Sequence, residues 1–183
     1  MPKLRWTFIA AIVLGAAAVL ATAAFDRHGG AKARVDAKAL VPGVWISEQI
    51  GPEQLAALKS QGFRAVVDLR PDDEVAGQPS ASTMGEAAAG QGLQFDYIPV
   101  AHGDVPSGAV ETLGRTLARE QTPVLLYCRS GRRAARTWAL AEASRPGGLD
   151  APAILNAVHK AGQDADDLAD QITDRIAARS ATH

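Results

Sequence analysis

Cysteine is almost absent from this chain. Among its 183 residues only Cys128 carries a thiol, so no internal disulfide can form and a cysteine-based structural zinc site is excluded. A lone thiol of this kind is either an inert core residue or a reactive group. Its neighbours in the sequence are what can decide between these two interpretations.

An excess of charge is also missing, and aromatic side chains are few. Lys and Arg together number 19 against 20 for Asp and Glu, and aromatic residues make up 5% of the chain. A chain with no global positive field and few stacking side chains is poorly equipped to hold nucleic acid. We therefore expect no nucleic-acid partner, and any anion site must be local.

The longest uncharged run extends from Trp6 to Phe25, after Lys3 and Arg5. Its length is about what a helix needs to cross the hydrocarbon layer of a membrane. We expect an N-terminal hydrophobic helix over residues 1–25, and two interpretations stay open: a membrane anchor, or a signal peptide cleaved after the triplet Ala21-Thr22-Ala23. The protein is accordingly expected at the cell membrane or exported to the periplasm.

The polar residues 26–40 are predicted to be a tether, and residues 41–180 a single folded domain. In this domain short apolar segments at 44–46, 63–69, 93–100 and 123–127 alternate with amphipathic or alanine-rich segments typical of helices. The alternation predicts an α/β fold, a parallel sheet with helices on both faces. Its active groove is expected at the carboxyl ends of the strands.

The segment from Cys128 to Arg133, Cys-Arg-Ser-Gly-Arg-Arg, joins the most hydrophobic predicted strand to a helix. Backbone amides at a helix N-terminus form an anion cradle, and the same field favours a thiolate. Three arginines within five residues would be unusual around an inert core cysteine. We predict that Cys128 is a nucleophile, that Arg133 binds two oxygens of an oxyanion, and that the loop residues between them contact the substrate (Arg129, Ser130, Gly131 and Arg132).

This loop resembles the active-site loop of two superfamilies, the cysteine-dependent phosphatases and the rhodanese-type sulfurtransferases. Tyrosine phosphatases have five residues between Cys and Arg, whereas rhodaneses have four, and four residues separate Cys128 from Arg133. The loop length alone therefore favours sulfur transfer.

A longer set of motifs resembles a bacterial phosphatase-like family that is also found fused to beta-lactamase-like hydrolases. The resemblance covers about residues 40 to 145 and rests on Val41-Pro-Gly-Val-Trp-Ile-Ser-Glu-Gln49, Gly62-Phe, Val67-Asp-Leu-Arg-Pro-Asp-Asp-Glu74, Gly77-Gln-Pro79, Ile98-Pro-Val100 and Cys128-Arg-Ser-Gly131. It implies a fold like that of the dual-specificity phosphatases, although some members of the family carry a sulfurtransferase name. Ala134 stands where the family normally has Ser or Thr, whose hydroxyl can hydrogen-bond the thiolate, and this departure implies slower breakdown of a phosphocysteine intermediate.

Three further residues are candidates for the site. Asp104, in the loop after the third predicted core strand, lies where phosphatase-like folds carry the acid that protonates the leaving group. Asp68 and Arg70 follow another strand and face the groove by topology, as substrate contacts or as a structural brace of the loop.

The sequence thus predicts a hydrolase of the tyrosine-phosphatase type that acts on a phosphorylated small molecule or protein, with protein phosphotyrosine among the candidate substrates, through a phosphocysteine intermediate. The alternatives are a sulfurtransferase that carries a persulfide on Cys128, and a catalytically weak module that binds anionic partners. No cofactor and no metal ligands are expected.

Overall fold

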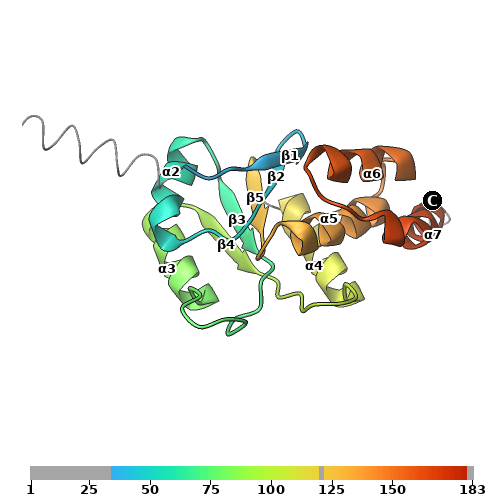
Figure 1. Ribbon diagram of the computed structural model, residues 1–183. Helices are drawn as coiled ribbons and strands as arrows, with labels where there is room; N and C mark the ends of the chain where they lie inside the picture. Colours follow the sequence, from blue (N-terminus) through green and yellow to red (C-terminus); the bar gives the residue numbers. More distant parts are fainter. Residues whose placement is uncertain (1–33, 120–121, 181–183) are drawn as a thin grey trace, which may run out of the picture. The chain divides into compact units, whose positions relative to one another are not determined.

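The computed structural model describes residues 34–119 and 122–180 (Figure 1). The chain from Val35 onward forms one compact unit. The hydrophobic helix predicted at 1–25, and most of the predicted tether, lie outside the described residues. Among the residues that are described, no helix is both long and apolar enough to cross a membrane.

A five-stranded sheet lies at the centre of the unit. Its strands are β1 (Lys38–Val41), β2 (Val44–Ser47), β3 (Ala65–Asp68), β4 (Gln94–Tyr97) and β5 (Val124–Tyr127), and their spatial order is β1-β2-β5-β3-β4. Strands β2 to β5 pair in parallel, but β1 pairs with β2 antiparallel. The prediction of a parallel sheet is therefore wrong at this edge: the sheet is mixed, because the short Gly43 turn allows the residues just before β2 to fold back as a hairpin.

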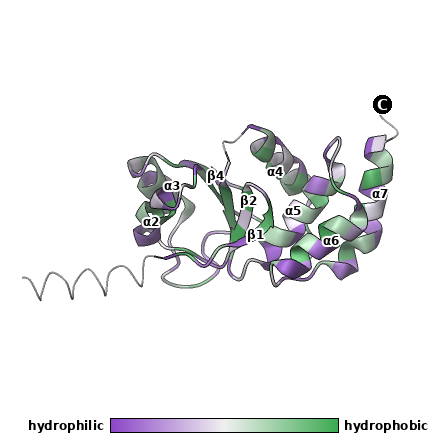
Figure 2. Cartoon of the chain, turned by 90° about the horizontal axis from the view of Figure 1, so that it is seen from above, coloured by the Kyte–Doolittle hydropathy of each residue, from purple (hydrophilic) through white to green (hydrophobic). Residues whose placement is uncertain are grey.

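Helices cover both faces of the sheet, as the alternating pattern predicted (Figures 1 and 2). The 3-10 turn η1 (Pro52–Gln54), α2 (Leu55–Ser60) and α3 (Ala81–Gly90) lie on one side. The other side carries α4 (Ser107–Arg119), α5 (Arg132–Ser144), α6 (Ala151–Lys160), the 3-10 turn η2 (Asp166–Leu168) and α7 (Ala169–Ser180).

The side chains of the central strands alternate between two hydrophobic cores, one on each face of the sheet. In β5, Leu126 packs in the core under α4 to α7, whereas Leu125 and Tyr127 pack in the core under α2 and α3. Successive side chains of a strand point to opposite faces, so every residue of β3 and β5 is buried. This accounts for the continuous apolar runs that identified these two strands in the sequence.

The four parallel strands end at the same level. Ser47, Tyr127, Asp68 and Tyr97 close β2, β5, β3 and β4, and they stand in register across the sheet. The loops that follow these strands therefore emerge along one edge of the sheet, which brings together segments that are far apart in the sequence.

Candidate active site

The loop from Cys128 to Gly131 leaves β5 at this edge and enters α5. Gly131 is the N-cap residue of α5 and has φ 83°, a left-handed conformation that favours glycine. A Cβ at this position would lie 3.1 Å from Nε2 of Gln163 and 3.4 Å from the Ser47 carbonyl oxygen. The loop therefore requires glycine for both its backbone conformation and its close packing.

The backbone of the loop offers a set of free donors. Within the described residues, none of the N–H groups from Arg129 to Arg133 donates a hydrogen bond to another part of the chain. The first N–H groups of a helix have no intrahelical acceptor, and together with the helix dipole they favour an anion. Free N–H groups at the start of a helix can together bind an oxyanion, and these follow Cys128 directly in the chain.

Arg133 reaches across the edge of the sheet to a carboxylate. Its Nη1 donates to Oε1 of Glu74 at 2.5 Å and to the Val100 carbonyl at 2.7 Å, and its Nη2 donates to Oε2 of Glu74 at 2.9 Å. These contacts use three of the five N–H donors of a guanidinium. The remaining two, on Nε and Nη2, share one edge of the planar group, which is the edge that can bind two oxygens of a phosphate.

Glu74 is held between two buried arginines. Besides Arg133, it accepts from Nε of Arg70 at 2.9 Å, and Arg70 also donates to the Gln49 side chain at 2.9 Å. Hydrogen bonding from Arg133 lowers the pKa of Glu74 to about 2, against the opposing effect of burial, with further help from Arg70. Glu74 is thus a fixed anion at neutral pH that orients Arg133.

Glu74 was not among the residues predicted for the site. In the sequence it is the last residue of the motif Val67-Asp-Leu-Arg-Pro-Asp-Asp-Glu74, with no role of its own assigned to it. A buried arginine needs a carboxylate partner, but only the strand order shows that the segment after β3 reaches the edge where Cys128 lies and supplies it.

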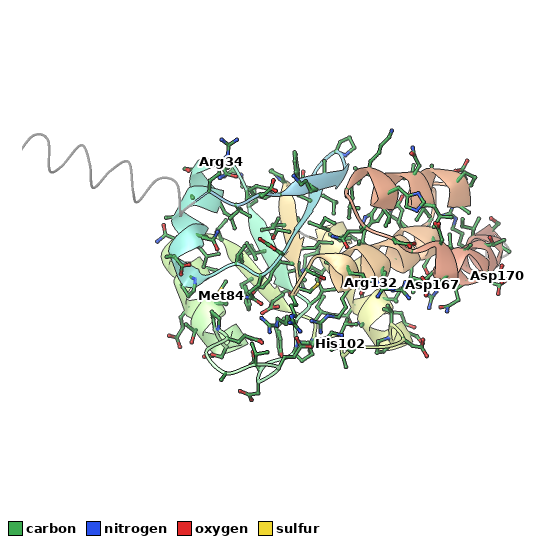
Figure 3. All side chains as sticks on the ribbon, viewed as in Figure 1. Arg34, Met84, His102, Arg132, Asp167 and Asp170 are labelled. Carbon is green, nitrogen blue, oxygen red and sulfur yellow. The ribbon has the colours of Figure 1, made fainter. Side chains whose placement is uncertain are left out.

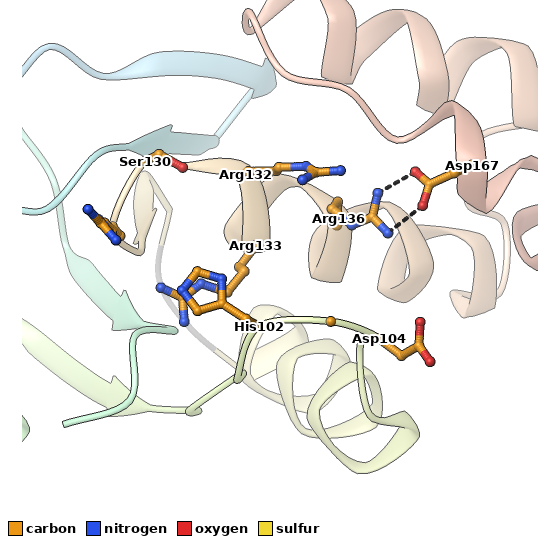
Figure 4. A pocket seen from close by; sticks show the side chains of 9 residues that line it. His102, Asp104, Ser130, Arg132, Arg133, Arg136 and Asp167 are labelled. Atoms are coloured by element: carbon orange, nitrogen blue, oxygen red, sulfur yellow. Dashed lines mark hydrogen bonds and ion pairs between the residues drawn. The ribbon is translucent and has the colours of Figure 1, made fainter. Parts of the chain in front are cut away.

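A pocket of about 420 Å³ opens at the start of α5 (Figures 3 and 4). It brings together most of the predicted site residues with groups from the loop after β4 and from η2; its lining comprises His102, Gly103, Asp104, Arg129, Ser130, Arg132, Arg133, Arg136 and Asp167. Cys128 is 1% exposed and does not line the pocket, so its thiol is buried.

The electrostatics of Arg133 link the wall of the pocket to this thiol. Burial alone would lower the pKa of Arg133, but hydrogen bonding to Glu74 and interaction with Cys128 outweigh it and raise the pKa above its ordinary value. Arg133 therefore remains a cation that can interact with the thiol and with an anion in the pocket.

The loop between β4 and α4 supplies His102 and Asp104, both exposed. His102 lies beside the end of Arg133, and its Nε2 is 3.8 Å from Oε1 of Glu74 (Figure 4). Asp104 lines the same pocket, but its carboxylate lies on the side of Arg136, away from Arg133. The structure thus places the predicted acid in the mouth of the pocket and not against the loop.

Asp68 and Arg70 are buried and do not line this pocket. Asp68 accepts the backbone N–H of Arg70 at 2.8 Å, while the Arg70 side chain contacts Glu74 and Gln49. Burial raises the pKa of Asp68 to about 6 although the Arg70 backbone N–H lowers it. These contacts are those of the structural brace, one of the two roles that the sequence left open.

A second ion pair, also absent from the sequence analysis, closes the far side of the pocket. Arg136, one helical turn beyond Arg132, donates from both terminal nitrogens to the carboxylate of Asp167 in η2. The hydrogen bond to Asp167 is the main reason why the pKa of Arg136 lies above its ordinary value. Nothing in the local sequence pairs α5 with η2, because they meet only through tertiary packing.

Metal ligands are scarce in the part of the chain that the structure describes. One group there, His159, Asp164 and Asp166, brings its ligand atoms within 4.8 Å of one another, and all three residues are exposed. An exposed cluster that includes two aspartates does not by itself define a metal site.

The fold of the described residues is similar to that of the tyrosine and dual-specificity phosphatases. A candidate phosphatase from Neisseria meningitidis superposes with a TM-score of 0.64 at 24% identity, covering 74% of this chain and 95% of that one. A kinase-associated phosphatase, solved with its catalytic-site cysteine replaced by serine, superposes with a TM-score of 0.60 at 12% identity. The superposition covers 79% of this chain and 97% of that one. At these identities the likeness establishes the fold.

The family is given by the sequence itself. Residues 36–145 match the phosphatase-like domain of the beta-lactamase hydrolase-like proteins, and the chain belongs to this family. The resemblance noted from the motifs is thereby confirmed. A beta-lactamase hydrolase-like protein of Xylella fastidiosa is 31% identical over 97 residues, which are 53% of this chain. The chain matches only 22% of the length of that relative.

Proposed function

We propose that this protein is a cysteine-dependent phosphatase that hydrolyses phosphomonoesters, with protein phosphotyrosine as one candidate substrate. The observation that carries the proposal is the combination of free loop N–H groups with Arg133, whose Nε edge makes no contact with Glu74 and whose guanidinium interacts with Cys128. Membership of a phosphatase-like family supports it.

In the proposed reaction the Cys128 thiolate attacks phosphorus in line with the leaving oxygen. A sulfur–phosphorus bond forms while the phosphorus–oxygen bond of the ester breaks, and Asp104 gives its proton to the departing oxygen. The loop N–H groups and Arg133 stabilise the charge on the three equatorial oxygens. Water then attacks phosphorus and the sulfur–phosphorus bond breaks, while the Asp104 carboxylate takes a proton from the water; phosphate is released and the thiolate and the acid are restored.

A second candidate is sulfur transfer, which the four-residue spacing between Cys128 and Arg133 favours. In that reaction the cradle would hold a persulfide on Cys128 and no proton donor would be needed. A third candidate, a binding module for phosphorylated or other anionic partners, is favoured by Ala134 in place of a hydroxyl residue. Anchoring to the cell membrane, or export after cleavage near Ala23, stays part of the proposal and concerns residues outside those described.

The experiment that tests the proposal is phosphate release from an aryl phosphate by the full chain in reducing buffer. Turnover that disappears in Cys128→Ser supports a cysteine-dependent phosphatase. No turnover above that control overturns it. Transfer of sulfur from thiosulfate to cyanide would then establish the second candidate, and phosphate binding without either reaction would establish the third.

A further inference from the structure

Two carbonyl groups of the loop are held from outside. The Ser130 carbonyl accepts a hydrogen bond from Nε2 of Gln163 at 2.9 Å, and the Arg129 carbonyl accepts one from the backbone N–H of Gln49 at 3.3 Å. The proposed chemistry uses neither contact, and both act on the backbone that forms the oxyanion cradle.

The direction of a carbonyl fixes the direction of the next N–H. A peptide group is planar and trans, so its C=O and its N–H point in opposite directions. When Gln163 holds the Ser130 carbonyl outward, the N–H of Gly131 must point away from Gln163, toward the interior of the loop. The contact from Gln49 acts on the N–H of Ser130 in the same way.

The peptide between Ser130 and Gly131 is the one that most needs such a restraint. Glycine populates positive and negative φ about equally well, so this peptide can rotate with little steric resistance from Gly131. After a half turn the Ser130 carbonyl would point into the cradle, where its partial negative charge repels an oxyanion. A hydrogen bond to that carbonyl therefore favours the anion-binding orientation.

Gln163 is well placed to provide the restraint because its own backbone is fixed. At the end of α6, Gly162 adopts φ 76°, and its N–H donates to His159 while that of Gln163 donates to Val158. This is a Schellman arrangement, which gives the residue after the glycine a defined position. Ala165, two residues later, is fully buried.

We propose that Gln163 is a positioning residue of the active site: through the Ser130 carbonyl it keeps the Gly131 N–H turned toward the bound phosphate. Gln163 lies beyond residues 36–145, the part that matches the family, so the C-terminal helices contribute to the site from outside that region. The inference rests on the proposed function insofar as it assumes that the loop binds a phosphate group.

The test measures binding of inorganic phosphate to the full chain, by calorimetry and by the NMR shift of the Gly131 amide. Gln163→Ala removes the donor, and we expect the dissociation constant for phosphate to rise about three- to tenfold. Gln163→Glu keeps the shape of the side chain but sets a carboxylate against the Ser130 carbonyl, so we expect this variant to lose more of its affinity for phosphate than Gln163→Ala does. Gln171→Ala, at an exposed glutamine in α7, is the matched control and should bind as the parent does.

In the parent, phosphate should shift the Gly131 amide resonance strongly, and in Gln163→Ala this shift should shrink while the unfolding midpoint stays unchanged. Equal affinities in the parent and in Gln163→Ala would overturn the inference, and so would an undiminished Gly131 shift. A parent that binds no phosphate would overturn it too. A parent that binds phosphate but releases none from an aryl ester contradicts the phosphatase proposal alone, because the binding comparison does not require turnover.

Discussion

Glu74 holds Arg133 end-on, with one carboxylate oxygen on each terminal nitrogen at 2.5 and 2.9 Å, across a separation of 59 residues in the sequence. Both side chains are largely buried. The guanidinium cannot rotate without breaking this pair, so the pair fixes the direction of the edge that carries Nε. A free arginine at the same place would sample many rotamers and lose entropy on binding phosphate.

Replacing Glu74 by Gln should therefore weaken the site without touching the loop. Hydrogen bonds to charged groups contribute about 1.5–3 kcal/mol, so we expect kcat/KM for an aryl phosphate to fall by about ten- to a hundredfold in Glu74→Gln. Because the pKa of Glu74 is about 2, the carboxylate is ionised throughout the assay range, and the loss should be the same at every pH from about 5 to about 8.

Asp73→Asn is the control for this change. Asp73 is the exposed neighbour of Glu74 and has φ 64°, a conformation that Asn also tolerates. The activity of Asp73→Asn should therefore match that of the parent. Parental kcat/KM in Glu74→Gln would show that Arg133 needs no partner to bind the phosphate.

Asp68 should make the stability of the protein depend on pH. Its folded-state pKa is about 6, above the ordinary value of 3.8, so the folded state binds the proton more tightly than the unfolded state. The contribution of Asp68 to stability is therefore full below about pH 4 and declines as the pH rises through 6, by up to about 3 kcal/mol.

Asp68→Asn removes this dependence, and the free energy of unfolding of the variant relative to the parent should rise between pH 4.5 and pH 7.5. Urea unfolding at the two pH values measures it. Asp170→Asn, at an exposed position in α7, should show no such rise. A difference that stays constant with pH would mean that Asp68 titrates alike in the folded and unfolded chain.

Sequence patterns predicted most of the fold because its signals are local. The apolar runs of β3 and β5 are buried on both faces, as the residue types indicated. Strand β1 was missed because its four residues carry only one buried side chain, Leu40, and so show no run.

For the site, the sequence identified the loop but not its supports. Cys128 and Arg133 belong to one contiguous motif, whereas Glu74 and Gln163 reach it from other segments. Which carboxylate meets Arg133 depends on strand order, and which side chain meets the Ser130 carbonyl depends on how α6 packs against the sheet. Neither is encoded in the spacing of nearby residues.

Ala134 offers a gain-of-function test. It is fully buried in the first turn of α5, next to Arg133. In Ala134→Ser the added hydroxyl can donate a hydrogen bond to the Cys128 thiolate as the phosphocysteine breaks down, and we expect kcat to rise about threefold to tenfold, as one hydrogen bond would provide. Single-turnover kinetics should show faster loss of the intermediate and an unchanged rate of its formation.

Thr137→Ser, at a buried hydroxyl further along α5 that donates to the Arg133 carbonyl, is a control that alters the helix without adding a donor near the thiol. A lower or unchanged kcat in Ala134→Ser would show that breakdown does not limit turnover.

The last prediction separates Asp104 from His102, which lie in the same loop and line the same pocket. If Asp104 protonates the leaving oxygen, Asp104→Asn should lower kcat/KM about a hundredfold for the hydrolysis of esters with poor leaving groups, such as phenyl phosphate, as expected when a general acid is lost. It should have much less effect on esters whose leaving group departs without a proton. His102→Gln should instead slow the hydrolysis of esters with good and with poor leaving groups alike, because His102 contacts Glu74 and would act only on the orientation of Arg133. The opposite result, a selective loss with poor leaving groups in His102→Gln and none in Asp104→Asn, would transfer the role of the acid to the residue that lies closer to Arg133.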